Sequence, residues 1–256
     1  MIYTTQNTMK ILKAISLSGT QPLKRSEIAE MTGINKTTCS HIISTLLSEG
    51  YVIRVSHKEG YVIGPAFYAL ATHISYNPRI TSICNNGIRW INKQLSCTCI
   101  LAVMENSQKY IIDYVDTEDN PFVQPIELLN EDLFQTATGR VLVSNLSRCS
   151  FNKVIERYGL PDCIGKSKIQ SADQLYEILK KIKKDKIVKV SVKHNDIKWH
   201  NYAFGIYSNS ECVAAIGIVI YSESEAVLEE QKICKILSEA SEKIHRALNV
   251  PATYSE

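Results

Sequence analysis

The stretch that most constrains the fold runs from residue 26 to residue 50 and has the pattern of two short helices joined by a tight turn. Ile28 and Ala29 place apolar groups on the first helix, and Gly33 stands where the chain must reverse. Asn35 is a favoured N-cap residue and predicts the start of the second helix. Apolar residues recur in that helix at three- and four-residue steps: Cys39, Ile42, Ile43, Leu46 and Leu47.

The opposite face of the second helix is polar and carries no acid before Glu49. At about 100° per residue, its members are Lys36, Thr37, Ser40, His41, Ser44 and Ser48. A helix with an apolar back, small hydrogen-bonding groups and a cation suits the major groove of DNA. The alternative is an ordinary helix pair whose outer face is solvated.

A β-hairpin is predicted directly after the helix pair and favours DNA binding. Residues 51–55 alternate with strand period, residues 57–60 form a turn, and residues 61–64 return as a second strand. This order of elements predicts a winged helix-turn-helix, supported by a further helix over residues 8–18 with Met9, Leu12 and Ile15 on its apolar side. The wing would contact backbone phosphates. The predicted DNA-binding residues are Arg25, Lys36, Thr37, Ser40, His41, Ser44, Arg54 and Lys58.

The formal charge is located in this first segment. Residues 1–64 hold seven Lys and Arg and four Asp and Glu, a net charge of +3 that equals the net charge of the whole chain. The remaining residues hold 22 groups of each sign and are neutral. This asymmetry fits a nucleic-acid-binding module joined to a neutral module. The lysines at positions 180–189 are interpreted as a solvated helix end.

The eight cysteines and the apolar runs predict the compartment. No Cys-x-x-Cys pair occurs, so the cysteines are interpreted as reduced, mostly buried thiols of a cytoplasmic protein. Cys97 and Cys99 would face one side of a strand, but no matching His or Cys pair accompanies them, and no metal or cofactor is expected. The N-terminus lacks the regions of a signal peptide, and the longest apolar run, nine residues from Val213 to Tyr221, is too short to span a bilayer.

A domain change is predicted after the wing. Residues 1–64 would form the DNA-binding domain, residues 65–78 a linker helix and residues 79–256 a sensor domain. The linker segment reads equally as the first helix of the second domain. The predicted strands of that domain cover residues 99–104, 110–115, 188–192, 202–207 and 212–220, and its helices 83–91, 138–146, 151–158, 171–185 and 225–248. Strands flanked by long helices indicate an α+β two-domain chain whose second domain is an α/β sensor with an antiparallel sheet.

With these segments in place, the chain resembles the IclR family of bacterial transcription regulators over nearly its whole length. The resemblance lies in the winged-helix pattern, including Glu49-Gly50-Tyr51 and the wing end Tyr61-Val62-Ile63-Gly64, and in the segment from Leu133 to Val141, which contains Thr136-Ala137-Thr138-Gly139-Arg140. It implies a GAF-like sensor domain. The implied effector-binding residues are Ala137, Thr138, Trp199, Asn201, Gly217 and Val219.

The chain departs from the family pattern at several positions. His41 replaces a frequent arginine of the recognition helix, which weakens a phosphate or base contact at neutral pH. In the sensor signature, Asp132, Phe134 and Arg140 replace proline, histidine and lysine. Gly217 and Val219 stand where some relatives have polar groups, which implies a bulkier or less polar effector.

The signature segment makes physical sense as an anion site. Thr136 is placed to cap the following helix, which would leave the amides of Ala137 and Thr138 pointing outward for a carboxylate. Asn201 would orient the rest of the molecule. The alternative is an ordinary capped helix packed on the sheet.

The leading functional hypothesis is a DNA-binding transcriptional regulator, acting as repressor or activator, whose operator affinity an organic acid controls. The resemblance implies a homodimer, often paired into a tetramer, on a near-palindromic operator. One alternative is a regulator whose sensor takes no ligand. The other is an enzyme with a DNA-binding appendage, for which His194 with Asp196 and the isolated Cys163 are the nearest candidates.

Overall fold

The computed structural model describes residues 2–56, 58–72, 76–117, 133–194, 197–221 and 230–249, with only the backbone for residues 72, 192–194, 197–199 and 221. The chain divides into two compact units, the first reaching Tyr76 and the second beginning at Asn77. Each unit has its own hydrophobic core. The two units are therefore described separately.

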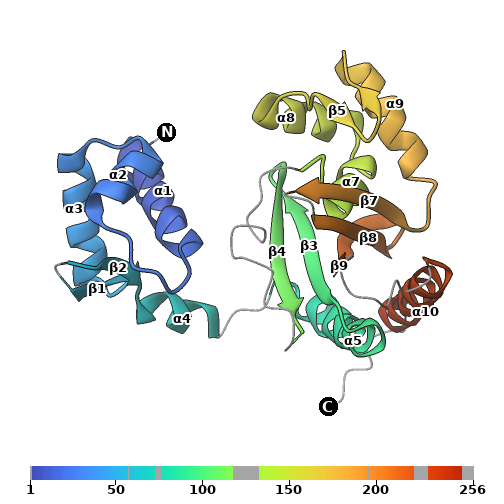
Figure 1. Cartoon of the computed structure of the whole chain (residues 1–256), viewed down its shortest axis with the longest axis horizontal. Helices are drawn as coiled ribbons and strands as arrows, with labels where there is room; N and C mark the ends of the chain where they lie inside the picture. The colour runs from blue at the N-terminus through green and yellow to red at the C-terminus, as the bar shows by residue number, and fades with distance from the viewer. Residues whose placement is uncertain are drawn as a thin grey trace. The chain divides into compact units, whose positions relative to one another are not determined.

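The first unit has the predicted order of helix, helix pair and hairpin (Figure 1). Asn35 accepts a hydrogen bond from the amide of Thr38 at 2.8 Å, which confirms it as the N-cap of the recognition helix. The hairpin strands pair antiparallel, as predicted. The elements are α1 (Tyr3–Leu17), α2 (Arg25–Thr32), α3 (Lys36–Ser48), β1 (Val52–Ser56), β2 (Gly60–Ile63) and α4 (Pro65–Thr72).

The core of the first unit confirms the apolar stripe of α3 and corrects that of α1. Cys39 is fully buried, and Ile42, Ile43 and Leu46 lie beside it. Helix α1 begins at Tyr3, not at residue 8, and Met9 is 61% exposed, so the prediction that Met9 supports the helix pair is wrong. The buried side of α1 consists of Asn7, Ile11, Leu12, Ala14 and Ile15, and Met9 lies about 200° from Ile11 around the helix.

Helix α4 covers part of the predicted linker segment. It runs from Pro65 to Thr72, and residues 73–75, including Ile74 of the predicted helix, lie outside the described residues. The apolar side chains of Phe67 and Leu70 are 37% and 53% exposed. The edge of Phe67 meets the ring of Tyr51 at 5.6 Å between centroids, which holds the start of α4 against the wing.

An additional backbone pairing joins the wing to the start of α2. Leu23 and Tyr61 exchange two backbone hydrogen bonds, of 3.0 and 2.9 Å. The preceding Gly60 has a φ of 119°, and an ideal Cβ on it would lie 2.2 Å from the carbonyl oxygen of Leu23. Glycine is required there because both the backbone conformation and the close approach exclude a side chain. The segment before α2 is thus fixed to the return strand of the wing.

The second unit is built on one antiparallel sheet with the strand order β4-β3-β9-β8-β7. All five predicted strands are confirmed, whereas the two-residue strands β5 and β6 were not predicted because they are too short to show a period. The elements are α5 (Pro78–Leu95), β3 (Thr98–Glu105), β4 (Gln108–Val115), α7 (Ala137–Ser144), α8 (Arg148–Tyr158), β5 (Cys163–Ile164), β6 (Ser167–Lys168), α9 (Ala172–Ile182), β7 (Val188–His194), β8 (Ile197–Ser208), β9 (Glu211–Tyr221) and α10 (Glu230–Asn249).

The two faces of this sheet carry different helices (Figure 1). Helices α5 and α10 cover the face formed by large apolar residues such as Leu101, Phe204 and Ile216. Helix α7 covers the other face, where Ala102, Ala203 and Ala215 are fully buried. Because side chains alternate between the faces of a strand, the same three strands supply both layers. Small residues on one face let α7 approach the sheet closely.

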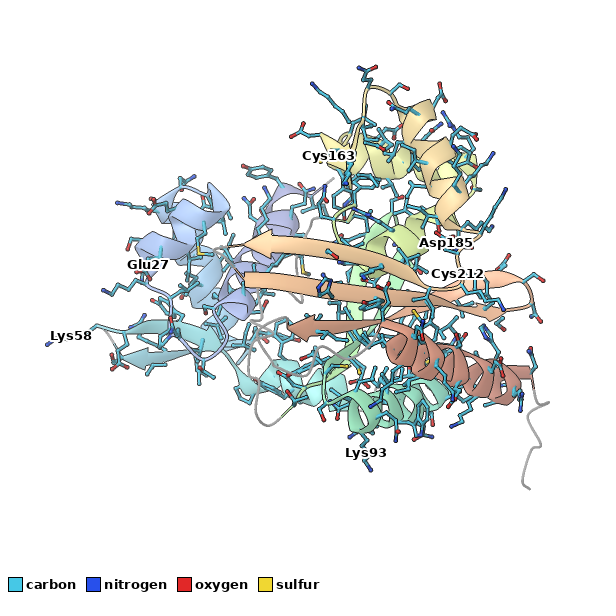
Figure 2. The ribbon with its side chains drawn as sticks, turned by 45° about the vertical axis from the view of Figure 1, so that its right-hand side comes forward. Glu27, Lys58, Lys93, Cys163, Asp185 and Cys212 are labelled. Atoms are coloured by element: carbon cyan, nitrogen blue, oxygen red, sulfur yellow. The ribbon has the colours of Figure 1, made fainter. Side chains whose placement is uncertain are left out.

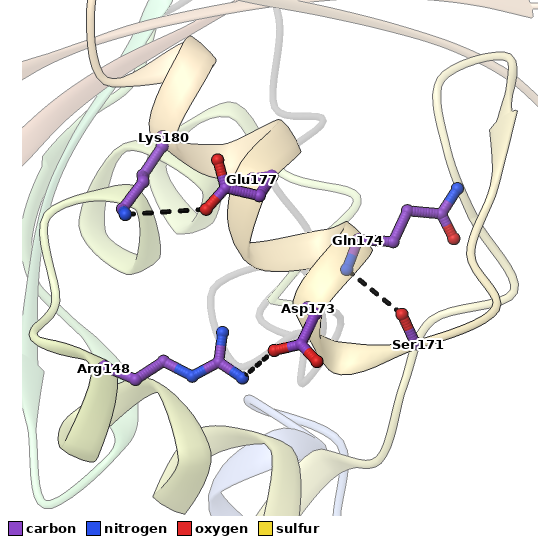
Figure 3. A network of polar contacts seen from close by, with 6 residues as sticks. All are labelled: Arg148, Ser171, Asp173, Gln174, Glu177 and Lys180. Atoms are coloured by element: carbon purple, nitrogen blue, oxygen red, sulfur yellow. Dashed lines mark hydrogen bonds and ion pairs between the residues drawn. The ribbon is translucent and has the colours of Figure 1, made fainter.

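Helices α8 and α9 are joined by Arg148 (Figure 3). Its guanidinium forms an ion pair with Asp173 and lies 4.7 Å from the ring centroid of Tyr176. Lys180 forms an ion pair with Glu177 at 3.6 Å, and the lysines at 180, 181, 183, 184, 186 and 189 are all exposed. This exposure fits a solvated surface, but Lys189 lies on β7 (Val188–His194) and not at the helix end, and it forms an ion pair with Glu230 at 2.6 Å.

Tyr207 connects the two helical layers at one end of β8. Its hydroxyl donates to Oδ1 of Asn145 at the end of α7 (3.3 Å), and its amide donates to Nε2 of His245 in α10 (3.1 Å). Since Nε2 accepts, the ring proton of a neutral His245 lies on Nδ1, 3.3 Å from Oγ of Ser241.

Among the described helices, none has the length and apolar character needed to cross a membrane.

We expect Gly60→Ala to destabilise the first unit more than Gly33→Ala, which serves as the matched control. Gly33 also has a positive φ, of 67°, but an ideal Cβ there has no neighbour within 4 Å. The control should therefore cost only the strain of a left-handed conformation, about 1–2 kcal/mol. Gly60→Ala adds contact with the Leu23 carbonyl, a further cost of about 1–3 kcal/mol.

The two units can be followed separately in one unfolding experiment. Trp90 and Trp199, the two tryptophans of the chain, both belong to the second unit, so fluorescence reports that unit while circular dichroism reports both. Equal destabilisation by the two substitutions in the circular dichroism transition would contradict the contact between Gly60 and Leu23.

Candidate nucleic-acid interface and effector site

The outer face of α3 begins beside a hollow in the first unit. This hollow has a volume of about 440 Å³ and is lined by Arg25, Ser26, Lys36, Thr37 and Ser40. Four of these are predicted DNA-binding residues. Ser26 also lines the hollow and was not among the predicted residues. His41 and Ser44 are exposed further along α3, outside the residues that line the hollow.

The N-termini of two helices explain why this hollow favours an anion. Arg25 and Lys36 are the first residues of α2 and α3. The first amides of a helix have no intrahelical acceptor, and the helix dipole places partial positive charge there. Within the described part of the chain, no ion pair involves Arg25, Lys36 or Arg54. The site therefore combines cations with open hydrogen-bond donors.

The wing contributes Arg54 and Lys58. Lys58 projects from the tip of the hairpin (Figure 2), next to residue 57, which lies outside the described residues. Arg54 lies on β1, and its guanidinium donates to Oη of Tyr61 at 3.1 Å. Arg25 donates to the same oxygen at 3.0 Å. The fold thus brings Arg25 of α2 and Arg54 of the wing together at one hydroxyl group, although they are distant in the sequence.

A second candidate site begins at the N-terminus of α7. Oγ1 of Thr136 accepts a hydrogen bond from the amide of Gly139 at 3.2 Å, which confirms the predicted cap. An ideal Cβ on Gly139 would lie 1.9 Å from the carbonyl oxygen of Leu133, so this turn needs a glycine. Lys109 donates to Oγ1 of Thr136 at 3.2 Å. This lysine on β4 adds a cation that no local sequence signal pointed to.

The first turn of α7 is more closed than the sequence predicted. Ala137 and Thr138 are only 3% and 2% exposed. Cγ2 of Thr138 lies 2.5 Å from the position of an ideal Cβ on Gly217, so the threonine methyl packs directly on the backbone of β9. The expectation of amides facing an open cleft is therefore corrected: this turn is buried against the sheet. The physical reason is that Gly217 leaves the space that Thr138 fills.

The remaining predicted residues lie on the adjoining strands. Asn201 of β8 pairs with Val219 of β9, one step along the ladder from the pair of Ala203 with Gly217. By strand alternation, Asn201, Gly217 and Val219 share the face that α7 covers. Trp199 precedes them on β8, opposite Tyr221, and its side chain lies outside the described residues.

Oδ1 of Asn201 is buried and has no hydrogen-bond partner among the residues that the structure describes. A buried acceptor without a donor is costly, by about 1–3 kcal/mol, and such groups are rare in folded proteins. Asn7 Nδ2 and Asn85 Oδ1 are unpaired in the same way, but only Asn201 lies on the sheet face covered by α7, which makes it the candidate partner for a molecule bound there. The site can thus offer an acceptor at Asn201 and positive charge near Thr136.

The paired thiols of Cys97 and Cys99 fit a structural role in the core of the second unit. Cys97 and Cys99 face the same side of the chain, as predicted, with their sulfur atoms 4.0 Å apart in the core. The hydrogen bond between them and burial raise the pKa of Cys99 well above its usual value. Cys163 is half-buried, and the His194 side chain and Asp196 lie outside the described residues. Among the described residues, no group of three or more His, Cys, Asp or Glu side chains is placed to hold a metal.

Comparison with known proteins gives the same division of the chain. Residues 75–246 match the family model of the bacterial transcriptional regulator IclR C-terminal domain, and residues 5–53 match a winged helix-turn-helix DNA-binding model. A search of curated proteins finds no match.

Solved structures share the fold over almost the whole chain. An IclR homologue from Microbacterium hydrocarbonoxydans, complexed with 4-hydroxybenzoate, has a TM-score of 0.72 at 14% identity, covering 96% of this chain and 98% of that one. An IclR regulator from Alicyclobacillus acidocaldarius has a TM-score of 0.71 at 16% identity, with 96% and 99% covered. The Thermotoga maritima IclR protein has a TM-score of 0.63 at 22% identity, also with 96% and 99% covered.

The IclR C-terminal model spans more than half of the chain, and the winged helix precedes it in the order that the solved structures share. The chain therefore belongs to the IclR family of bacterial transcriptional regulators, with a DNA-binding winged helix followed by a ligand-binding domain.

Proposed function

We propose that this regulator binds its operator through the α3 face and the wing, and that a small organic acid in the second unit controls the affinity. The observation that carries the effector hypothesis is the buried acceptor of Asn201, for which the described residues supply no donor. A hydroxyl or amine of the ligand would donate to Oδ1 of Asn201. A carboxylate of the same ligand would lie near the positive charge of Lys109 at the start of α7. The complex of the Microbacterium homologue with 4-hydroxybenzoate supports this class of ligand.

The proposed DNA contacts divide into two kinds. Thr37, Ser40, His41 and Ser44 on α3 would reach base edges in the major groove, together with Lys36. Arg25, Arg54 and Lys58 would contact phosphates, which supply affinity but no sequence information. This division follows from the position of each group. The polar residues of α3 lie on one face that is exposed except at the partly buried Ser40, and Lys58 lies at the tip of the wing.

The proposed regulation is a shift between two states of the chain. Residues 1–64 would bind DNA, residues 65–78 would link, and residues 79–256 would respond to the effector. An effector that binds one state more tightly shifts the population toward it by its difference in affinity. The active form would be a homodimer or homotetramer on a near-palindromic operator, without catalytic activity, cofactor or metal.

A regulator with a ligand-free sensor is the second candidate. It is favoured by the packing of Thr138 onto Gly217, which leaves Ala137 and Thr138 almost fully buried. Thermal denaturation of the full chain against a panel of hydroxy and aromatic acids separates the candidates. A ligand that binds the folded chain raises its melting temperature, and the stabilisation grows with the logarithm of the ligand concentration divided by Kd. No shift with any member of the panel favours the ligand-free sensor.

We expect Lys36→Ala and Ser40→Ala each to weaken operator binding by about 1–3 kcal/mol, because each removes a contact to a base edge. Binding to unrelated DNA should change little for Ser40→Ala. Lys58→Ala should weaken binding to all sequences alike and lower the dependence of affinity on salt. Mobility-shift titrations with operator and random duplexes over a range of salt concentrations measure both effects.

The control for a lost charge is Lys93→Ala, on an exposed position of α5 in the second unit. It removes the same charge as Lys36→Ala from the unit that is not proposed to contact DNA, and should leave the affinity within about twofold. If Lys93→Ala and Lys36→Ala weaken operator binding equally, the assignment of the α3 face is wrong.

We expect Asn201→Leu to stabilise the ligand-free protein and to blunt the effector response. Leucine has a similar size and removes a buried acceptor that has no partner, so unfolding should cost on the order of 1 kcal/mol more. The same substitution removes the bond that would orient the effector, which should lower effector affinity about tenfold. Chemical denaturation and calorimetry with the identified acid give the two quantities. If Asn201→Leu binds the effector as tightly as the wild type, the ligand does not contact Asn201.

A further inference from the structure

The hydroxyl of Tyr61 is the meeting point of two guanidinium groups. Arg25, the first residue of α2, donates to it at 3.0 Å, and Arg54 of β1 donates at 3.1 Å. The guanidinium of Arg54 also lies 5.3 Å from the centroid of the Tyr61 ring. The three residues come from the helix pair and from both strands of the wing.

Tyr61 is itself held rigidly. It is 5% exposed, and its backbone is paired with Leu23 through two hydrogen bonds. The glycine before it closes the approach between the two segments, as described above. The hydroxyl oxygen is therefore a fixed point on the first unit, whereas the two arginine side chains are long and have exposed surface.

The arrangement concentrates positive charge without a carboxylate to balance it. No ion pair in the described part of the chain involves either arginine. Burial raises the pKa of Tyr61, but the hydrogen bonds from the two guanidinium groups and their charges outweigh it, so the pKa is lowered. Two positive charges that share one neutral acceptor favour the binding of an anion from solution. Arg25 also lines the hollow at the start of α3, where Lys36 is a further cation.

We propose that Tyr61 is a positioning residue whose hydroxyl holds Arg25 and Arg54 as a paired clamp for a phosphate group of the DNA backbone. The inference rests on the proposed function and assigns to Tyr61 a role that is separate from its place in the core. Each guanidinium spends one of its five N–H donors on Tyr61 and keeps the others for phosphate oxygens. Holding both side chains in advance reduces the conformational entropy lost on binding.

The test uses the full chain and a random-sequence DNA duplex, because a phosphate clamp acts on any sequence. Tyr61→Phe keeps the buried ring and removes the shared acceptor. We expect its affinity for the duplex to fall about 2- to 10-fold, the effect of one lost hydrogen bond. The slope of log affinity against log salt concentration should also become less steep, toward that of the variant with both Arg25→Ala and Arg54→Ala.

Two comparisons separate positioning from a structural effect. Tyr51→Phe makes the same chemical change in the same unit, on a tyrosine that forms no hydrogen bond with either arginine in the described structure, and should leave affinity and salt dependence unchanged. In the background of Arg25→Ala and Arg54→Ala, the further change Tyr61→Phe should have no effect on DNA binding, because the groups it positions are gone. An equal loss in both backgrounds would overturn the proposal.

A second variant decides the matter if Tyr61→Phe lowers the melting temperature substantially. Replacing both Arg25 and Arg54 by lysine keeps the charges but removes the planar fork that bonds Tyr61 and phosphate together. A weaker affinity for the duplex supports the clamp, and wild-type affinity overturns it. Failure of the wild-type chain to bind any duplex in a salt-dependent way would overturn the proposed function itself. Normal DNA binding by both the wild type and Tyr61→Phe would overturn this inference alone.

Discussion

The close packing of α7 on the central sheet is the contact on which the effector-binding unit depends. It is possible because one face of β3, β8 and β9 carries Ala102, Ala203, Ala215 and Gly217, while the other face of the same strands carries large apolar residues. Thr138 then packs its methyl group on Gly217. In the proposed effector site, the distance between helix and sheet would set the room for a ligand beside the first turn of α7.

This packing also explains why an effector could influence the rest of the unit. The first turn of α7 carries the Thr136 cap, and its last turn ends at Asn145, which accepts a hydrogen bond from Tyr207. The amide of Tyr207 donates in turn to His245 of α10 on the opposite face. A ligand that moves α7 relative to β9 would therefore strain contacts to both helical layers. Packed interiors transmit such changes because they have few voids to absorb them.

In the first unit the corresponding constraint is the pairing of Leu23 with Tyr61. It attaches the wing to the segment that leads into α2, so that the cations of helix and hairpin lie on one rigid body. The polar face of α3 alone would also suit a solvated helix. Arg25 and Arg54 add positive charge beside that face. A helix lying in the major groove would use such charges to contact the phosphates on either side.

The sequence by itself determined the elements whose signals are local. Asn35 and Thr136 were predicted as caps because a cap bonds an amide three residues away, and the stripe of α3 was predicted because helical neighbours recur at three and four residues. Only the tertiary structure decided that Met9 is exposed, that Thr138 packs on Gly217 and that Tyr61 joins two arginines. It also decided that Asn201 finds no donor among the described residues. Those facts depend on residues brought together from distant elements, and the spacing of residues along the chain carries no record of that packing.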